Sequence, residues 1–492
     1  MTQRGDRLIH DRQAKLDRLI QQGVDPFPPR FHRTHDTQEA GRSFLEREQA
    51  GQEGQFVTVA GRMVRLRRMG KASFADIQDG QGTMQLFLQK SAMEASYGLL
   101  ESLDLGDFVG ASGQVFRTKA GEVSVRVGEL TMLAKAMRPP PEKFHGLQDQ
   151  EQRYRQRYLD MIANRGVVEL MRLRSRMITA MRSFLDSRGF LEVETPILVP
   201  VPAGAMANPF VTRHHALDRE LYLRVATELY LKRLIVGGID KVYELGRVFR
   251  NEGIDLNHNP EFTLLETYEA YADYNDVMTM VEEMVCAIAE STLGTLQVSF
   301  EGQKIDLSPP WRRKSLHAAV KEHAGIDLND YPDAQSLAER MRADNITVTY
   351  AESRGLLIDK LVGTVVEPHL VQPTFLLDYP VEMSPLAKAR TVDPRYVERF
   401  EAFVSGMEVA NSYTELNDPV VQRRRLEEQE ELRKRYQGEE LDRTDEDFLL
   451  ALEHGMPPTG GLGMGVDRLV MLLTGQKSIR DVVLFPQVRS IG

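Results

Sequence analysis

Residues 242–268 read VYELGRVFRNEGIDLNHNPEFTLLETY, and the rest of the chain is organised around this stretch. Apolar and polar residues alternate in its first part, a polar loop follows, and alternation resumes at Phe262, which predicts a long β-hairpin. Arg250 and Glu252 end the first arm, and His258 lies in the loop. These groups suit a nucleotide, with Arg250 on a phosphate, His258 near an outer phosphate and Phe262 against a base. The alternative is an edge hairpin with its charges in water, and the spacing alone does not choose between them.

The same hairpin also matches a family motif. FRNEG, a short loop and HNPEF resemble motif 2 of the class II aminoacyl-tRNA synthetases, while residues 189–196 (GFLEVETP) resemble motif 1 and residues 461–469 (GLGMGVDRL) resemble motif 3. Each pattern is weak alone, but three in the expected order support one another. The resemblance implies ATP as a substrate. Its ATP-binding positions fall here on Arg250, Glu252, His258, Phe262, Gly465 and Arg468, of which Arg250 and Arg468 are the catalytic ones.

Composition narrows the class of protein. The 492 residues allow two or three domains, and 42% apolar with 27% charged residues is typical of a soluble protein. No apolar run approaches the roughly 18 residues of a membrane span, and the first residues lack the apolar segment of a signal peptide, so we expect a cytoplasmic protein without a membrane partner. Cys286 is the only cysteine, which excludes an intramolecular disulfide and a cysteine-based zinc site. The net charge of −10 means that any RNA contact must use local basic patches.

Residues 56–135 read as five short strands separated by glycine-bearing turns, which predicts a small closed OB-type barrel. Phe74 offers a stacking face, the Gln85 amide can read a base edge, and Arg68 belongs to a basic cluster on the preceding strand. The alternative is plain barrel core with a surface amide. MGKASF followed by GTMQ resembles the anticodon-binding barrel of the class II lysyl, aspartyl and asparaginyl enzymes. That resemblance implies that Phe74 and Gln85 bind the central anticodon base and that Glu122 discriminates a neighbouring one.

Three consecutive prolines at residues 139–141 stiffen the connection that follows the barrel. We therefore divide the chain into a helical extension (1–55), the barrel (56–135), a linker (136–165) and a catalytic domain (166–492). The linker closely resembles that of bacterial lysyl-tRNA synthetases. The predicted fold class is α+β, a five-stranded barrel followed by the class II antiparallel sheet flanked by helices.

The catalytic domain begins with an amphipathic helix over residues 167–188, followed by the motif 1 strand. In class II enzymes this segment forms a dimer interface, so the resemblance implies a homodimer; a helix packed on its own domain is the alternative. Further on, Glu228 stands between a strand and a helix, where it can accept an ammonium group or merely favour the helix dipole. The family reads A-P-E-L-Y-L-K here and this chain has Thr227 in the proline position. Ala203 and Asn208 replace a usual glycine and arginine.

Two carboxylates near the end of the chain suit a metal ion. Glu408 and Glu415 are seven residues apart, which in a regular strand places them on opposite faces, so we expect a turn near Asn411 and Ser412 to bring them together around Mg²⁺. The glycine strand that follows, with Gly461, Gly463 and Gly465, is predicted to let a base lie close to its backbone, with Arg468 stacked opposite Phe262.

The charges of the residues that can line the amino-acid pocket indicate which amino acid is the substrate. Lysine needs acids for two ammonium groups and a polar cap for the distal one, whereas aspartate needs free cations, which the matching segments lack. Residues that can supply the lysine pocket are Glu228, Glu266, Tyr268, Asn411, Tyr413 and Glu415. The whole-chain resemblance is to lysyl-tRNA synthetase, which implies activation of L-lysine and its transfer to tRNA(Lys). The alternatives are an aspartyl or asparaginyl synthetase and a catalytically idle RNA-binding paralogue.

Overall fold

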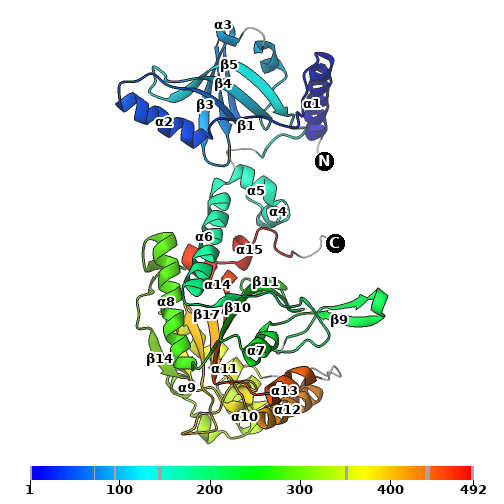
Figure 1. The fold of residues 1–492 in the computed structure, drawn as a ribbon, viewed down its shortest axis with the longest axis vertical. Coiled ribbons are helices and arrows are strands. Elements are labelled where there is room, and N and C mark those ends of the chain that lie inside the picture. Colours follow the sequence, from blue (N-terminus) through cyan, green and yellow to red (C-terminus); the bar gives the residue numbers. More distant parts are fainter. Residues whose placement is uncertain are drawn as a thin grey trace. The chain divides into compact units, whose positions relative to one another are not determined.

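The computed structural model describes residues 3–70, 72–93, 96–141, 147–205, 207–348, 353–437 and 444–488. The chain divides into two compact units, Met1–Gln148 and Asp149–Gly492 (Figure 1). Each unit has its own hydrophobic core and is described by itself. The described residues contain no helix that is both long and apolar enough to cross a membrane.

The first unit is built on a closed barrel with the strand order β1-β2-β3-β5-β4. Its strands are β1 (Phe56–Met69), β2 (Ala72–Gln78), β3 (Thr83–Gln89), β4 (Phe108–Arg117) and β5 (Val123–Ala134), and its helices are α1 (Gln3–Gln21), α2 (Thr37–Gln49), α3 (Lys90–Met93) and η1 (Tyr97–Glu101). Alternate strand residues fill the barrel, among them Val57, Ile77 and Leu86. The predicted five-stranded barrel is confirmed.

The second unit is built on an eight-stranded sheet with the order β14-β15-β16-β17-β18-β11-β10-β6. All neighbours are antiparallel except the two outermost pairs, β14 with β15 and β10 with β6. The strands of this sheet are β6 (Leu191–Glu192), β10 (Lys241–Phe249), β11 (Glu261–Ala270), β14 (Arg312–Ser315), β15 (Thr374–Leu377), β16 (Arg399–Val404), β17 (Met407–Thr414) and β18 (Thr459–Gly465). The α+β class predicted from the sequence is confirmed.

Helices and two small sheets surround this sheet. A three-stranded sheet contains β7 (Leu198–Val199), β8 (Val211–His214) and β9 (Arg219–Leu223), and a two-stranded one contains β12 (Gln297–Phe300) and β13 (Gln303–Asp306). The α-helices are α4 (Gln150–Arg155), α5 (Arg157–Ala163), α6 (Arg165–Ser187), α7 (Glu228–Val236), α8 (Tyr274–Leu293), α9 (Leu316–Ala324), α10 (Ala334–Ala343), α11 (Arg354–Leu361), α12 (Pro419–Gln437), α13 (Glu446–Glu453), α14 (Val466–Thr474) and α15 (Ile479–Val482). The 3-10 helices of this unit are η2 (His215–Leu217), η3 (Leu328–Asp330), η5 (Glu367–His369) and η6 (Val381–Met383), and η4 (Val362–Val366) is a π-helix.

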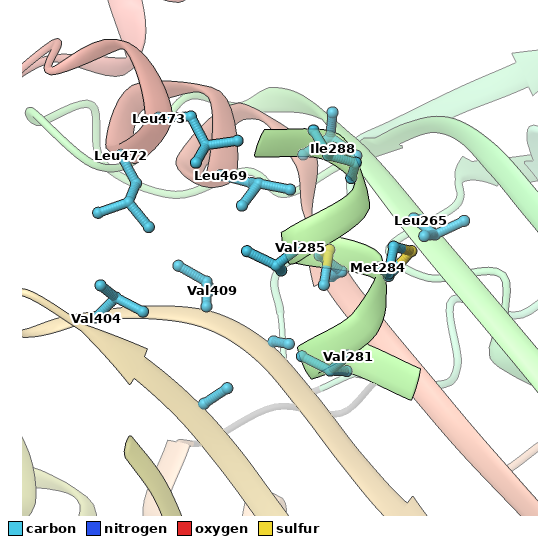
Figure 2. Packing of buried hydrophobic residues seen from close by; sticks show 14 of the residues in the cluster. Leu265, Val281, Met284, Val285, Ile288, Val404, Val409, Leu469, Leu472 and Leu473 are labelled. Carbon is cyan, nitrogen blue, oxygen red and sulfur yellow. The ribbon is translucent and has the colours of Figure 1, made fainter. Parts of the chain in front are cut away.

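One face of the sheet is covered by α8 and α14, and Figure 2 shows this packing. The α8 residues Val281, Met284, Val285 and Ile288 lie among Leu265 of β11, Val404 and Val409 of the β16–β17 hairpin, and Leu469, Leu472 and Leu473 of α14. Met177, Met181 and Leu185 of α6 join the same core. Such an apolar layer on one face leaves the polar face of the sheet for a binding site.

The predicted hairpin around residues 242–268 is present. In it, β10 pairs antiparallel with β11, with Val248 opposite Phe262 and Phe249 opposite Glu261. A buried ion pair ties its first arm to the motif 1 segment, because Arg224 contacts Glu244 at 2.5 Å and Glu244 accepts hydrogen bonds from the N–H and hydroxyl of Thr195. The hairpin is thus fixed at its base while its loop stays at the open end of the sheet.

Candidate functional site

A cavity of about 660 Å³ lies over the polar face of the large sheet. Every cavity residue predicted from the sequence lines it: Glu228, Arg250, Glu252, His258, Phe262, Glu266, Tyr268, Glu408, Asn411, Tyr413, Glu415, Gly465 and Arg468. These residues come from α7, from the loop between β10 and β11, from α14, and from the neighbouring strands β11, β17 and β18 or the residue directly after β17. The sheet therefore gathers side chains that are more than 180 residues apart in the chain.

Strand register orders this cavity into rows. Glu266 of β11 lies opposite Gly463 of β18, which lies opposite Asn411 of β17. Two residues further along, Tyr268, Gly461 and Tyr413 form the next row. The rows lie about 7 Å apart, since a strand rises about 3.3 Å per residue.

The open end of the cavity carries cations and an aromatic ring. The Arg250 guanidinium lies 5.2 Å from the centroid of the Phe262 ring, and its Nε has no hydrogen-bond partner among the described residues. Burial lowers the pKa of Arg250, which Glu252 opposes. Arg468 donates to the Glu408 backbone oxygen at 3.0 Å and its Nη2 lies 3.0 Å from Nε2 of His258, whose Nδ1 contacts Asp255 at 2.8 Å. This end offers an unpaired guanidinium group and an aromatic face, which suits a phosphate with an attached base.

The expected turn near Asn411 and Ser412 is wrong, because β17 runs unbroken from Met407 to Thr414. A β-bulge takes its place: Ala402 lies opposite Ala410 but Phe403 lies opposite Glu408, so Val409 is the extra residue. The bulge reverses the alternation once. Glu408 therefore faces the cavity together with Asn411, Tyr413 and Glu415, although their spacing is odd.

The bulge does not bring Glu408 and Glu415 close to each other, because they stand near opposite ends of β17, on the order of 20 Å apart by strand rise. Glu401, on the partner strand of the hairpin and opposite Asn411, is instead close enough to Glu408 for their charges to interact. Burial raises the pKa of Glu401 to about 7, Arg399 opposes this, and Glu408 adds to it. Burial likewise raises the pKa of Glu367 to about 7, and Glu408 adds to that as well. Glu401 was not identified from the sequence, although Glu401 and Glu408 stand near the two ends of the short segment FEAFVSGME, on either side of a glycine turn.

The deep end of the cavity holds a buried lysine between two carboxylates. Lys232 of α7 is fully buried, contacts Glu228 at 2.6 Å and forms an ion pair with Glu415. The Tyr413 hydroxyl donates to Glu228 at 2.6 Å. Burial opposes the charge on Lys232, but Glu228 and Glu415 raise its pKa, so it stays an ammonium group. Lys232 was also missed, although its spacing of four residues from Glu228 on a helix was visible in the sequence.

Glu266 occupies the row between the two ends. It is buried, and its Oε1 accepts a hydrogen bond from the Thr227 backbone N–H at 3.2 Å, while its Oε2 has no partner among the described residues. Burial raises the pKa of Glu266 to about 7 and Glu228 adds to the shift, whereas Thr227 and Arg250 oppose it. A buried carboxylate oxygen without a donor is costly, so this position is prepared for a cationic ligand.

Asn411, in the same row as Glu266, contacts Arg399, which lies opposite Tyr413 in the next row. Arg399 contacts Glu401 at 2.5 Å and its Nε donates to Asn411 Oδ1 at 3.2 Å. The guanidinium is also held by the Met383 carbonyl and the Ser384 hydroxyl. Both cations of the inner cavity, Lys232 and Arg399, are thus already paired with carboxylates.

Three of the four glycines of β18, those at positions 461, 463 and 465, have different surroundings. A Cβ on Gly461 would overlap the Glu415 carboxylate and lie 2.8 Å from the Tyr268 ring, so this glycine makes room for side chains and not for a base as expected. A Cβ on Gly463 would meet only the Asn411 carbonyl oxygen, at 3.9 Å, and one on Gly465 would meet the Arg468 side chain at 3.7 Å. Space for a ligand next to the backbone therefore exists at Gly463 and Gly465.

The positions that depart from the family pattern lie around this cavity. Ala203 lines it, and Gly204 next to it has a φ of +95° and packs against Ala226. The Asn208 carbonyl accepts a hydrogen bond from the Asn251 N–H at 2.7 Å, which fixes the chain directly after Arg250.

In the barrel unit, Phe74 and Gln85 share the outer face of β2 and β3. The Phe74 ring centroid lies 5.1 Å from that of Phe87, and Gln85 stands next to Phe87 in the alternation of β3. Gln85 is mostly buried, and its Oε1 accepts from the Ser124 hydroxyl at 2.8 Å, which leaves its amide N–H groups for a ligand.

Glu122 and Arg68 are the other two predicted anticodon-binding residues, and only Glu122 lies on the face that carries Phe74 and Gln85. Glu122 lies in the turn before β5, in the alternation that also places Ser124 on the outer face. Arg68 does not join it, because it lies opposite Ser73, whose side chain points inward, and it donates to the Leu100 carbonyl at 2.7 Å.

Comparison with known proteins agrees with this geometry. Residues 149–489 match the family model described as tRNA synthetases class II (D, K and N), and residues 57–133 match the model of an OB-fold nucleic acid binding domain. The chain is 52% identical to the lysine–tRNA ligase of Dehalococcoides mccartyi over 477 residues, 96% of each chain. It is 51% identical to the enzyme of that name from Moorella thermoacetica over 98% of each chain. With the one from Bacillus subtilis it shares 49% identity over 97% of this chain and 96% of the relative.

Because Gly461 and Gly463 have different surroundings, replacing each of them with alanine is expected to change the stability of the protein by different amounts. Gly461→Ala must displace Glu415 or the Tyr268 ring inside a packed, charged cluster, and we expect it to destabilise the second unit by about 1–3 kcal/mol. Gly463→Ala, on the same strand with only one distant neighbour, is the matched control and is expected to unfold like the wild type. Thermal unfolding of the full chain measures both. Equal midpoints for the two variants would contradict the close packing at Gly461.

Proposed function

Since the chain belongs to the class II tRNA synthetases of the aspartate, lysine and asparagine group, and within it to the lysine–tRNA ligases, we propose that its cavity activates L-lysine with ATP. Lysyl-adenylate and pyrophosphate are the products of the first step, and a terminal hydroxyl of tRNA(Lys) displaces AMP in the second. The family and the enzyme class predicted from the three motifs are confirmed. The assignment of each side chain to a ligand group is the proposal.

The observation that carries the choice of lysine is the charge of the inner cavity. Glu228, Glu266 and Glu415 face it, and Lys232 is the cation among them. Carboxylates are thus in excess, as a ligand with two ammonium groups requires. The depth also fits, because five bonds separate Cα from Nζ of lysine, about 6 Å when extended, and the Glu266 row lies about 7 Å from the Tyr268–Tyr413 row.

We assign the α-ammonium of lysine to the row of Glu266 and Asn411. The distal ammonium then lies among Tyr268, Tyr413, Glu228 and Glu415. The lysine carboxylate points towards Arg250, at the end of the cavity that suits the α-phosphate of ATP. In this arrangement the base stacks on Phe262 and contacts the backbone at Gly463 and Gly465, with Arg468 on its other side and His258 and Glu252 near the outer phosphates.

The reaction then needs no protein nucleophile. The lysine carboxylate attacks the α-phosphorus and pyrophosphate leaves, while Arg250 and Arg468 stabilise the charge that develops on the phosphate oxygens. Positioning and electrostatic stabilisation are the main contributions in such transfers. The closed deep end excludes water from the carboxylates that hold the amino acid.

Mg²⁺ fits the open end of the cavity. This ion is usually held by one or two carboxylates together with substrate phosphates, and no group of three or more possible metal ligands occurs among the described residues. Glu408, which is partly exposed, faces the cavity and contacts Arg468 at 3.2 Å, would be such a carboxylate, whereas Glu401 on the neighbouring strand is already paired with Arg399. Bound there, Mg²⁺ would neutralise phosphate charge. Glu415, the second ligand predicted from the sequence, is committed to Lys232, and we assign it to lysine instead.

The barrel is proposed to bind the anticodon through Phe74 and Gln85, with Glu122 at the edge of the same face. A homodimer is also proposed, and it is supported by apolar residues exposed in and after the motif 1 strand, where Leu191 is 52%, Ile197 45% and Leu198 47% exposed. We expect the enzyme to work in the cytoplasm.

An aspartyl or asparaginyl specificity is disfavoured by the pairing of the inner cations. An aspartate side chain needs a free cation, but Lys232 contacts two carboxylates and Arg399 contacts Glu401. An idle RNA-binding paralogue is disfavoured because the cavity retains each of the expected ATP-binding side chains.

ATP–pyrophosphate exchange without tRNA tests the proposal directly. The purified full chain, with Mg²⁺ and each of the twenty amino acids in turn, is expected to exchange with lysine alone. Exchange with aspartate or asparagine would overturn the charge argument for the cavity, and no exchange with any amino acid would favour the idle paralogue.

The raised pKa of Glu266, about 7, predicts a pH dependence. Its carboxylate is ionised above this pH and protonated below it, so kcat/KM for lysine in the exchange reaction is expected to fall as the pH drops below about 7, by up to tenfold per unit. Glu266→Gln should have a low kcat/KM without this acid limb. A limb that survives in Glu266→Gln would mean that another group, such as Glu401, controls it.

Stacking of a base on Phe74 predicts an effect confined to tRNA. Phe74→Ala is expected to raise the KM for tRNA(Lys) in aminoacylation by on the order of tenfold or more. Its lysine-dependent exchange should equal that of the wild type. Phe27→Ala, at an exposed phenylalanine outside the barrel strands, is the control. Unchanged aminoacylation by Phe74→Ala would contradict the proposed anticodon face.

A further inference from the structure

Thr227 stands directly behind Glu266 and outside the cavity lining. It is only 3% exposed and forms the N-cap of α7, with a φ of −105°. Its hydroxyl makes no capping hydrogen bond to the helix, and together with the backbone N–H it lowers the pKa of Glu266. The hydrogen bond that the geometry defines is that of the backbone N–H, which donates to Glu266 Oε1 at 3.2 Å.

This contact fixes which oxygen of Glu266 remains available. With Oε1 held from behind, Oε2 is the buried oxygen without a donor, and Glu266 itself lines the cavity. Among the groups around it, Glu228 from α7 and Glu415 from the end of β17 are carboxylates. Tyr268 from β11 and Arg250, directly after β10, are donors, but neither makes a hydrogen bond to Oε2. Among them, the Thr227 N–H is the contact that orients the carboxylate.

We propose that Thr227 is a positioning residue whose backbone N–H orients Glu266 so that Oε2 receives the α-ammonium of the substrate, making position 227 a determinant of selection for α-amino acids. The inference rests on the lysine site proposed above. The role depends on the residue having a backbone N–H, which proline lacks.

Thr227→Pro and Thr227→Ala separate the contribution of the backbone N–H from that of the hydroxyl. Alanine removes the hydroxyl but keeps the N–H, whereas proline removes both and needs a φ near −65°, about 40° from that of Thr227. Because Oε1 of Glu266 then loses its donor, we expect the KM for lysine of Thr227→Pro to exceed that of Thr227→Ala by about three- to tenfold. The kcat of exchange and the KM for ATP should be the same in both variants.

A lysine analogue identifies the ammonium group concerned. 6-Aminohexanoate keeps the carboxylate and the distal ammonium but lacks the α-ammonium, so its inhibition constant against lysine exchange should be equal in the two variants. A structural disturbance of the cavity would weaken lysine and 6-aminohexanoate alike. The ratio of the two affinities therefore reports the α-ammonium contact alone.

The outcomes are distinct. Equal KM values for lysine in Thr227→Pro and Thr227→Ala, or an equal loss of lysine and 6-aminohexanoate, would overturn the role of Thr227 while the lysine site stands. Absence of lysine exchange in the wild type would overturn the proposed function itself. Should Thr227→Pro not fold, an ester in place of the Ala226–Thr227 amide removes only the N–H, and an unchanged selectivity for lysine over 6-aminohexanoate would then overturn the proposal.

Discussion

The fully buried ammonium of Lys232 is the constraint around which the second unit is arranged. It lies between Glu228, on its own helix, and Glu415, at the end of β17, with the rings of Tyr413 and Tyr268 at 5.5 and 5.9 Å. Removing one partner of such a buried group is costly, about 3–5 kcal/mol, because the remaining charge has no water to compensate it. Helix α7 and the sheet are therefore held in one relative position, and the deep wall of the cavity is held with them.

The same cluster shows how buried carboxylates are kept together in the cavity, because Lys232 compensates part of their charge. Its carboxylates repel each other, which burial in a medium of low dielectric intensifies, and one lysine does not balance them all. The remaining imbalance is seen at Glu266, whose pKa is raised to about 7 and whose Oε2 has no donor among the described residues, and at Glu415, whose pKa burial raises well above its ordinary value. In the proposed lysine complex, the two ammonium groups of the ligand would offset this excess of carboxylates.

The sheet sets the distances of the site. Three neighbouring strands, β11, β18 and β17, place side chains in rows at fixed spacing, and the glycines of β18 keep the middle of the rows open. The bulge at Val409 lets Glu408 face the cavity while Val409 packs into the core against α8, as Figure 2 shows. One extra residue in a strand thus serves the core and the site together.

The sequence by itself determined the barrel, the hairpin of residues 242–268 and many of the residues that line the cavity, because strand alternation, glycine positions and short ordered motifs are local properties of the chain. It also indicated the excess of acids. Which carboxylates meet was decided only by the tertiary structure. Alternation predicts opposite faces for Glu408 and Glu415, and neither the bulge that changes this nor the pairing of Glu415 with Lys232 and of Glu401 with Arg399 follows from spacing along the chain. Those contacts depend on the register between strands and on the docking of α7, which the packing of the whole unit fixes.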